Sequence, residues 1–193
     1  MSTDFFAYIS RMKLIDRWSL MRNVHVENIQ EHSHQVAVLA HALCEIDRVF
    51  FGGKCSSAKA VELALFHDAS EVITGDLPTP VKYFNPEIKK SYGHIENIAR
   101  NKLLSMLPDE LAEIYRPLIF GEDGSREAFF VKAADKLSAY TKCLEELSAG
   151  NKEFVKASQS ISEQLEKYRS EPAVAWFMNN CLEGYSKTLD ELA

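Results

Sequence analysis

Apolar residues recur along this chain at intervals of three and four, and this helical spacing is the feature that most limits its fold. The clearest example is a stripe along one helix face, made by His32, Val36, Leu39, Leu43 and Ile46. The alternation of apolar and polar residues that marks half-buried strands is almost absent. We therefore expect an all-α protein in which residues 1–193 form a single helical bundle domain.

Local start and stop signals give approximate helix boundaries. Asn28 followed by Glu31 is typical of a capping box, and Gly52 marks the end of the helix that it opens. Asn85 and Pro86 combine a cap with a first-turn proline. The expected helices cover residues 5–20, 29–48, 57–73, 86–106, 109–117, 125–149, 152–169 and 172–191.

Composition and charge exclude several classes of protein. The chain has 46% hydrophobic and 26% charged residues, which is typical of a globular protein. A net charge of −6 without a Lys/Arg cluster argues against binding to polymeric nucleic acid, but a small phosphorylated substrate needs only one local cation. No apolar run could span a membrane, and the amphipathic N-terminus does not resemble a signal peptide. With four dispersed cysteines, these features predict a soluble cytoplasmic protein that does not bind membranes.

Two histidines and two carboxylates interrupt positions that should be apolar. His32 begins the stripe described above, and His67, with Asp68 beside it, continues the apolar face of the helix expected at 57–73. Asp135 directly follows two alanines in the long helix expected at 125–149. One such histidine alone is usually a core or cap residue, but an unpaired buried carboxylate costs several kcal/mol. Together, on three helices, these residues favour a mixed nitrogen and oxygen site for one divalent cation.

The other polar candidates carry less weight. Four histidines lie at other helix angles or in polar surroundings, and we expect them to be surface or structural residues: His25, His34, His41 and His94. The run Glu145–Glu146 is typical of a solvated helix face.

The interrupting residues also match the pattern of a known family. "EHS" at 31–33, "HD" at 67–68 and the single Asp in "KAADKL" at 132–137 resemble the H…HD…D signature of HD-domain metal phosphohydrolases. Three longer stretches are similar to the bacterial 5′-deoxynucleotidase branch: "RWSLMRNV" at 17–24, "HDASEVITGDLPTPVKYF" at 67–84 and "FVKAADKLSAYTKCLEEL" at 130–147. The resemblance covers nearly the whole chain, and the TGDLPTPVKYF loop is far more specific than the short signature.

The resemblance implies an all-α HD-domain fold and one metal ion held by His32, His67, Asp68 and Asp135. It further implies a cytoplasmic homodimer that hydrolyses deoxyribonucleoside 5′-monophosphates to deoxynucleoside and phosphate. A set of two imidazoles and two carboxylates, without thiolates, suits a divalent ion such as Co²⁺, Mn²⁺ or Zn²⁺. Some HD enzymes hold a second metal through extra histidines between HD and the last Asp, but only His94 lies there, so we expect one ion per chain.

Given this resemblance, three further residues have expected roles in the hydrolysis of a deoxyribonucleoside monophosphate; without it, the structural alternative would be favoured for Arg17. Glu71, four residues after His67, would orient or deprotonate the attacking water. Arg17 would bind two phosphate oxygens at once, unless it is only a solvated helix residue. Trp18 would pack against the deoxyribose and exclude a 2′-hydroxyl, unless it is only a core aromatic near the end of the first helix.

The remaining expected contacts to substrate come from the loop and from the metal ligands. Asp76 would hydrogen-bond the 3′-hydroxyl or assist the leaving oxygen, unless it is only a turn residue. With Asp76, the next three residues of the loop would hold the sugar: Leu77, Pro78 and Thr79. Two of the expected metal ligands, Asp68 and Asp135, would also contact the substrate.

Two other functions remain open at this point. One is an HD-type phosphodiesterase or nucleoside triphosphate hydrolase, which differs in its substrate. The other is a non-catalytic helical metal-binding or scaffold protein, which predicts metal-dependent folding without turnover and leaves Glu71 without a task.

Overall fold

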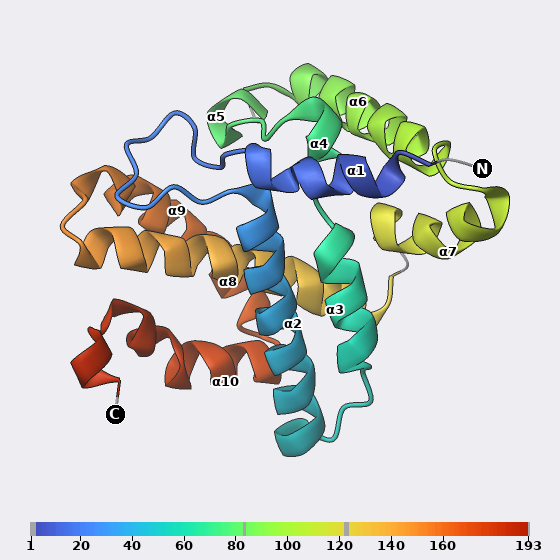
Figure 1. Cartoon of the computed structure of the whole chain (residues 1–193). Coiled ribbons are helices and arrows are strands. Elements are labelled where there is room, and N and C mark those ends of the chain that lie inside the picture. The colour runs from blue at the N-terminus through green and yellow to red at the C-terminus, as the bar shows by residue number, and fades with distance from the viewer. Residues whose placement is uncertain (1–2, 83, 122–123, 193) are drawn as a thin grey trace.

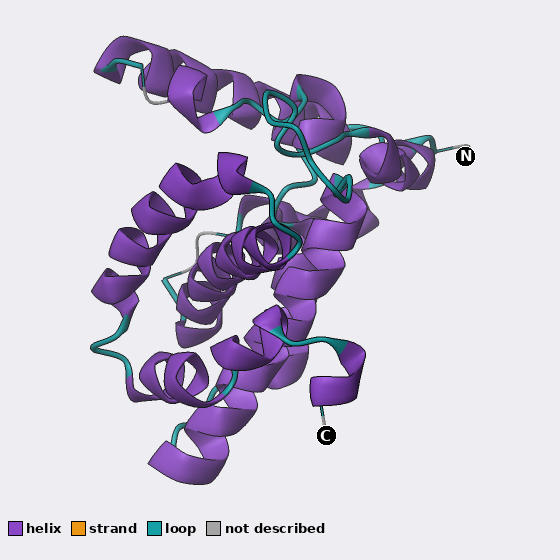
Figure 2. Cartoon of the chain, turned by 90° about the vertical axis from the view of Figure 1, so that its left-hand side faces the viewer, coloured by secondary structure: helices purple, strands orange, loops and turns teal. Residues whose placement is uncertain are grey.

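The computed structural model describes residues 3–82, 84–121 and 124–192, and within these ranges the chain forms helices and no strand (Figure 2). An isolated antiparallel bridge joins Asp16 to Asn28. The all-α prediction is therefore confirmed, as the helical spacing of the apolar residues indicates. None of the described helices is both long enough and apolar enough to cross a bilayer.

Three helices form the centre of the molecule (Figure 1). α2 (Ile29–Phe51) packs against α3 (Ser57–Phe66) and α8 (Arg126–Ser148), and α3 also contacts α8. α9 (Val155–Leu165) packs on α8, and α10 (Pro172–Asn180) packs on α2. The buried side chains at the centre include Val36, Leu43, Leu63, Phe130 and Leu137. Removing such apolar surface from water stabilises the fold by about 25 cal/mol per Å².

A second group of helices covers one end of this core. α1 (Phe5–Ile9), α4 (Glu71–Thr74), α6 (Pro86–Leu104) and α7 (Asp109–Phe120) contribute to or pack around a smaller buried cluster. Its buried members are Phe5, Ala69, Leu103, Leu104, Leu107 and Ile119. In Figure 1, α1, α4, α6 and the short α5 (Thr79–Lys82) lie above α2 and α8, and α3 leads up to them. The residues that follow α3 therefore lie between the two clusters.

The start of α2 agrees closely with its sequence signal. The Asn28 side chain accepts hydrogen bonds from the backbone N–H groups of Gln30 and Glu31, both at 3.0 Å, and Glu31 accepts one from Asn28 N–H at 3.1 Å. The predicted capping box is thus present. Gly52 ends the helix in the left-handed conformation, with φ at 72°. This cap fixes where α2 begins, next to His32.

Two predicted helices that lie close to the candidate site are too long. The range 5–20 contains α1, a 3-10 turn η1 (Ser10–Leu14) and then a loop, in which Trp18 has φ at 58°, incompatible with a right-handed helix. α3 ends at Phe66, and a turn precedes α4. Successive i to i+3 bonds, such as Glu71 N–H to Asp68 O at 2.9 Å, replace the helical pattern there. His67 and Glu71 therefore do not share a face of one continuous helix.

Smaller differences occur toward the C-terminus. α6 ends at Leu104 rather than 106, and α7 continues beyond 117, because Pro117 fits within its last turn. The range 152–169 contains α9 with a 3-10 turn at each end, η2 (Lys152–Phe154) and η3 (Glu166–Tyr168). α10 ends at Asn180, and the 3-10 turns η4 (Leu182–Ser186) and η5 (Leu189–Glu191) follow it in place of a continued helix.

Candidate active site

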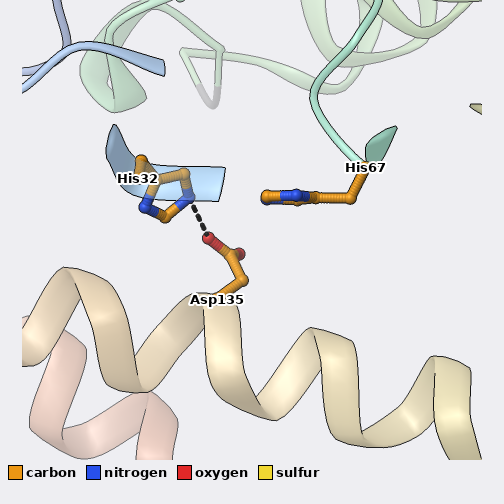
Figure 3. Close-up of side chains that lie close together, drawn as sticks. All are labelled: His32, His67 and Asp135. Carbon is orange, nitrogen blue, oxygen red and sulfur yellow. Dashed lines mark ion pairs between the residues drawn. The ribbon is translucent and has the colours of Figure 1, made fainter. Parts of the chain in front are cut away.

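Side chains from three segments meet at the end of the central core (Figure 3). His32 lies in the first turns of α2, His67 directly follows α3, and Asp135 lies in α8. One ligand atom from each residue lies within 4.8 Å of the other two. Nε2 of His32 is 3.2 Å from an Asp135 carboxylate oxygen, and the centroids of the two imidazoles are 5.3 Å apart. The sequence predicted this meeting from residues that are far apart along the chain.

The opposite ring nitrogens hold the two imidazoles in place. Nδ1 of His67 is 2.7 Å from the backbone oxygen of Ala64, which can only accept, so this nitrogen donates. Nδ1 of His32 lies 3.1 Å from the hydroxyl of Ser138. Both Nε2 atoms are buried and make no hydrogen bond of normal geometry with the described residues. Imidazoles that ligate metals are commonly fixed in this way, through the nitrogen that does not bind the ion.

Asp68 completes the predicted set. Its Oδ2 atom lies 3.1 Å from Nε2 of His67 and 3.6 Å from Nε2 of His32. The closest group of three ligand atoms does not include Asp68, but the carboxylate borders both imidazoles. The three clustered residues and the adjoining Asp68 offer two imidazole nitrogens and two carboxylates, a donor set that fits a borderline divalent cation.

Burial and mutual charge strongly perturb these groups. Burial lowers the pKa of His32, and the positive charge of Arg17 lowers it further. Burial also opposes protonation of His67, yet the charge of Asp68 outweighs this effect and raises the His67 pKa to about 9. The imidazole neighbours hold the pKa values of Asp68 and Asp135 below their usual range, despite the burial of both carboxyls. A cation that binds Nε2 of His67 must therefore displace a proton at neutral pH.

Glu71 and Asp76 lie beside this group. One carboxylate oxygen of Glu71 is buried and has no hydrogen-bond partner among the described residues. Burial raises the pKa of Glu71 to about 10, and repulsion from Asp68 and Asp76 contributes. Burial likewise raises the pKa of Asp76. Perturbed acids gather in this way at functional sites, where a bound cation or substrate offsets their repulsion.

Arg17 and Trp18 lie in the loop over residues 15–28, and both are largely shielded from solvent. The Arg17 side chain is 13% exposed, so the alternative of a solvated helix residue is wrong. The charges of Glu27, Asp135 and Asp68 act on its guanidinium. Trp18 packs against Phe154, with ring centroids 5.4 Å apart. Neither residue lies in a helix, and the alternative that Trp18 is only a packing aromatic stays open because its ring rests on the buried Phe154.

The predicted sugar-binding loop connects α4 to α5. Asp76, Leu77 and Pro78 are half-buried in it, and Thr79 begins α5 with a side chain that lies outside the described part of the chain. Gly75 precedes them with φ at 72° and ψ at 166°, a conformation that is essentially restricted to glycine. Its carbonyl accepts a hydrogen bond from the Tyr92 hydroxyl at 3.2 Å, which ties the loop to α6.

Two charged residues near the site escaped the sequence reasoning. Glu27 binds both Arg17 and Trp18, and Lys136 places its ammonium 2.9 Å from an Asp135 oxygen. The only available signals were their positions, beside the capping residue of α2 and beside a predicted ligand. Neither signal indicates a contact across the site.

Glu146, in the last turns of α8, corrects an explicit prediction. It is 1% exposed, and its carboxylate accepts hydrogen bonds from Lys142 Nζ at 2.5 Å, Val24 N–H at 2.9 Å and Asn151 Nδ2 at 2.7 Å. The run Glu145–Glu146 is therefore not a solvated face, because only its first residue is exposed. The i, i+4 spacing from Lys142 was the missed signal. The four histidines expected at the surface are indeed exposed: His25, His34, His41 and His94.

Comparison with known proteins identifies the family. Residues 4–185 match the family described as 5′-deoxynucleotidase YfbR-like. The chain belongs to the YfbR-like 5′-deoxynucleotidase family. A 5′-deoxynucleotidase of Vibrio vulnificus is 51% identical to it over 99% of this chain and 98% of that protein. The 5′-deoxynucleotidase YfbR of Salmonella typhi is 53% identical over 99% of this chain and 96% of that protein.

Solved structures place the YfbR-like chain in the HD-domain fold. An HD-domain phosphohydrolase from Listeria innocua superimposes with a TM-score of 0.84 at 25% identity, over 94% of this chain and 88% of that one. The cyanophage S-2L HD phosphohydrolase DatZ, described as bound to dA and one catalytic Zn²⁺ ion, has a TM-score of 0.66 at 21% identity, over 92% and 96% of the two chains. The second likeness concerns the fold alone.

Proposed function

We propose that this chain is a metal-dependent 5′-deoxynucleotidase, which hydrolyses deoxyribonucleoside 5′-monophosphates to deoxynucleoside and phosphate. Membership of the YfbR-like family and the names of relatives about half identical to it support this activity. The observation that carries the proposal is the meeting of His32, His67 and Asp135, whose ligand atoms lie within 4.8 Å of one another. The Nε2 atoms of both histidines are buried and each lies within 3.2 Å of a carboxylate oxygen, so nitrogen and oxygen donors converge as they do at a metal site.

The metal ligands in this proposal are His32, His67, Asp68 and Asp135. Their chemistry fits one divalent ion per chain, with Co²⁺, Mn²⁺ and Zn²⁺ as the candidates. When bound, the ion supplies Lewis acidity and a template for the phosphate. The two carboxylate ligands, Asp68 and Asp135, also border the substrate.

Glu71 handles the attacking water. In the metal-free chain its pKa of about 10 keeps it protonated at neutral pH, because it is buried and repelled by Asp68 and Asp76. Once positive charge at the ligands offsets that repulsion, the Glu71 pKa falls and its carboxylate can orient the water or accept its proton. Asp76 then hydrogen-bonds the 3′-hydroxyl or assists the leaving oxygen.

Arg17 binds the phosphate, and the loop and Trp18 surround the sugar. The guanidinium is buried close to the carboxylates of the site, so a phosphate held there would be screened little by water. Leu77, Pro78 and Thr79 contact the sugar after Asp76. Trp18 excludes a 2′-hydroxyl, which makes the enzyme selective against ribonucleotides; a wall of this kind rejects a hydroxyl by about 10²-fold.

A phosphate-release assay tests the proposal. Metal-stripped protein is resupplied with single divalent ions and assayed on deoxy- and ribonucleoside 5′-monophosphates, triphosphates and cyclic dinucleotides. We expect release from deoxyribonucleoside monophosphates only with an added ion. Turnover of triphosphates or cyclic dinucleotides instead would favour the HD-type phosphodiesterase or triphosphatase. Metal-dependent folding without any turnover would identify a non-catalytic metal-binding or scaffold protein.

Trp18→Ala tests the sugar selectivity separately. We expect the ratio of kcat/KM for a deoxyribonucleotide to that for its ribo counterpart to fall toward one, in a protein that stays folded. An unchanged ratio, with only a loss of stability, would make Trp18 a packing residue. The ratio is informative because a smaller folded fraction lowers both activities equally.

We further propose that the chain acts as a single-domain homodimer in the cytoplasm, with a small-molecule substrate and no binding to polymeric nucleic acid or membranes. These points are supported by the resemblance to the bacterial enzymes and by the net charge of −6. Size-exclusion chromatography with light scattering measures the molar mass of the protein directly. The mass of a monomer would overturn the proposed homodimer.

A further inference from the structure

A single carboxylate oxygen holds both residues that the proposed function assigns to phosphate and sugar. Oε2 of Glu27 accepts a hydrogen bond from Arg17 Nη1 at 2.5 Å and another from the Trp18 indole Nε1 at 3.1 Å. The Glu27 side chain is 15% exposed and that of Arg17 is 13% exposed. Hydrogen bonds to an ionised carboxylate in such shielded surroundings are the stronger class.

The backbone around Glu27 is fixed independently of its side chain. Arg17 N–H donates to the carbonyl oxygen of Glu27 at 2.9 Å, and Ile29 N–H donates to Ile15 O at 2.9 Å. Asp16 and Asn28 form the isolated bridge between these pairs. Main-chain hydrogen bonds therefore join the two ends of the loop, residues 15–17 and 27–29, and fix the backbone that carries the Glu27 side chain.

Trp18 needs such a contact more than an ordinary aromatic does. Its φ of 58° is the only positive value among the described residues other than glycine, and a bulky side chain rarely adopts it. Its carbonyl accepts a hydrogen bond from Met21 N–H at 2.8 Å, and its ring rests on Phe154. The bond to Glu27 fixes the polar edge of the indole and so sets the direction of the ring. Strained residues of this kind concentrate at ligand-binding positions.

Arg17 has competing partners for its charge. Asp68, Asp76 and Asp135 all act on the guanidinium, although Glu27 is the strongest of the four. Without Glu27, the guanidinium would be drawn toward the carboxylates that the proposed mechanism reserves for the metal and the sugar. Glu27 engages one guanidinium nitrogen and keeps the group at the edge of the site.

We propose that Glu27 is a positioning residue that fixes Arg17 and Trp18 together, and so couples phosphate binding to the choice of sugar. This inference rests on the proposed function. Its consequence is specific: changing Glu27 should relax selection of the sugar although Glu27 itself touches neither sugar nor phosphate. A displacement of about 1 Å at a positioned group can cost roughly 10²-fold in rate.

Two substitutions separate the hydrogen bonds from the charge. Glu27→Ala removes both, and we expect the deoxy/ribo ratio of kcat/KM to fall about tenfold, with a raised KM for the deoxyribonucleotide. Glu27→Gln keeps an acceptor oxygen for the indole but loses the charge that holds Arg17. We expect Glu27→Gln to keep the ratio within about twofold of wild type while kcat/KM falls for both sugars.

Arg22→Ala is the matched control. Arg22 lies in the same loop and forms an ion pair with Glu153 at 2.8 Å, but its side chain is 94% exposed. Removing it breaks a charged contact of the loop without touching Arg17 or Trp18. We expect the deoxy/ribo ratio of Arg22→Ala to equal that of wild type.

Tryptophan emission supplies a readout that does not depend on turnover. The chain has two tryptophans, so Trp176→Phe leaves Trp18 as the sole emitter. In that background we expect Glu27→Ala to shift the emission to longer wavelength, as the indole gains contact with water, and Glu27→Gln to shift it less.

The outcomes distinguish this inference from the function beneath it. If Trp18→Ala lowers the ratio but Glu27→Ala leaves both the ratio and the emission unchanged, Glu27 positions nothing and the function stands. If Trp18→Ala itself leaves the ratio unchanged, the proposed sugar wall fails. An equal effect of Arg22→Ala and Glu27→Ala would show general loosening of the loop and would also overturn the inference.

Discussion

Replacing Glu146 with glutamine removes the charge from a carboxylate that is almost completely buried. This carboxylate anchors the far side of the loop that carries Arg17 and Trp18, through the backbone N–H groups of Val24 and His25 at 2.9 and 3.1 Å. The buried Lys142 ammonium is its counter-charge. Glu146→Gln therefore perturbs folding without touching any proposed metal or substrate ligand.

The magnitude follows from the pKa of Glu146. Burial alone would raise this pKa, but hydrogen bonds from Lys142, Val24 and Asn151 outweigh it and lower the pKa from 4.5 to about 2. That change corresponds to roughly 3 kcal/mol of stability at pH 7. Because the folded-state pKa lies below the unfolded value, the stabilisation is complete above pH 4.5 and is lost as the pH falls toward 2. Because Lys142 also loses its counter-charge, the expected loss at pH 7 is about 3–5 kcal/mol.

Urea unfolding of the metal-free protein measures the effect, and Glu145→Gln is its matched control. Glu145 is the neighbouring residue and gives the same change of charge, but it is exposed, so we expect a change within about 0.5 kcal/mol. The difference between wild type and Glu146→Gln should shrink as the pH is lowered from 5 toward 2. Equal losses for the two variants, or a difference that persists unchanged at low pH, would refute the reasoning.

The remaining predictions concern the proposed site. Asp68→Ala and Asp135→Ala should each abolish metal-dependent turnover and lower the bound metal from about one ion per chain, as measured by elemental analysis; either variant with full activity and full metal would remove that residue from the site. Glu71→Ala should keep metal and substrate binding but lose roughly 10²–10⁴-fold in kcat, whereas a raised KM with unchanged kcat would make Glu71 a binding residue. Arg17→Ala should lower kcat/KM more than Arg17→Lys does, since lysine keeps the charge but not the fork, and equal values for both variants and wild type would exclude the phosphate clamp.

Local sequence signals predicted most of the fold. The capping box at Asn28 and Glu31, the stop at Gly52 and the cap at Asn85 all appear in the structure at ends of helices. These signals act over three or four residues, so the sequence contains all that is needed to recognise them. The breaks near Trp18 and after Phe66 were missed because apolar spacing continues through them while the backbone leaves the helix.

The meeting of His32, His67 and Asp135 was predictable for a different reason. His32, His67 and Asp135 occupy positions where apolar residues are favoured, and a buried polar group needs a compensating partner wherever it lies. Neither helix angle nor spacing could indicate that the Glu27 carboxylate faces Arg17 and Trp18. That contact depends on how an irregular loop closes, and loops of this kind follow long-range packing rather than local preference.

The same reasoning explains why the loop needs two buried carboxylates. Residues 15–28 form no helix and contribute little to the apolar core, so apolar packing alone cannot give this loop one conformation. Glu146 satisfies the backbone at Val24 and His25, and Glu27 orients the side chains at the other end. The Glu146 carboxylate accepts from four groups, and one oxygen of Glu27 accepts from two, so each acid stabilises the loop conformation that supplies these donors. The loop that is proposed to recognise phosphate and sugar is thus ordered by polar contacts. Substitutions that remove the charge of Glu27 or Glu146 should therefore change the conformation of this loop, while the helical core keeps its fold.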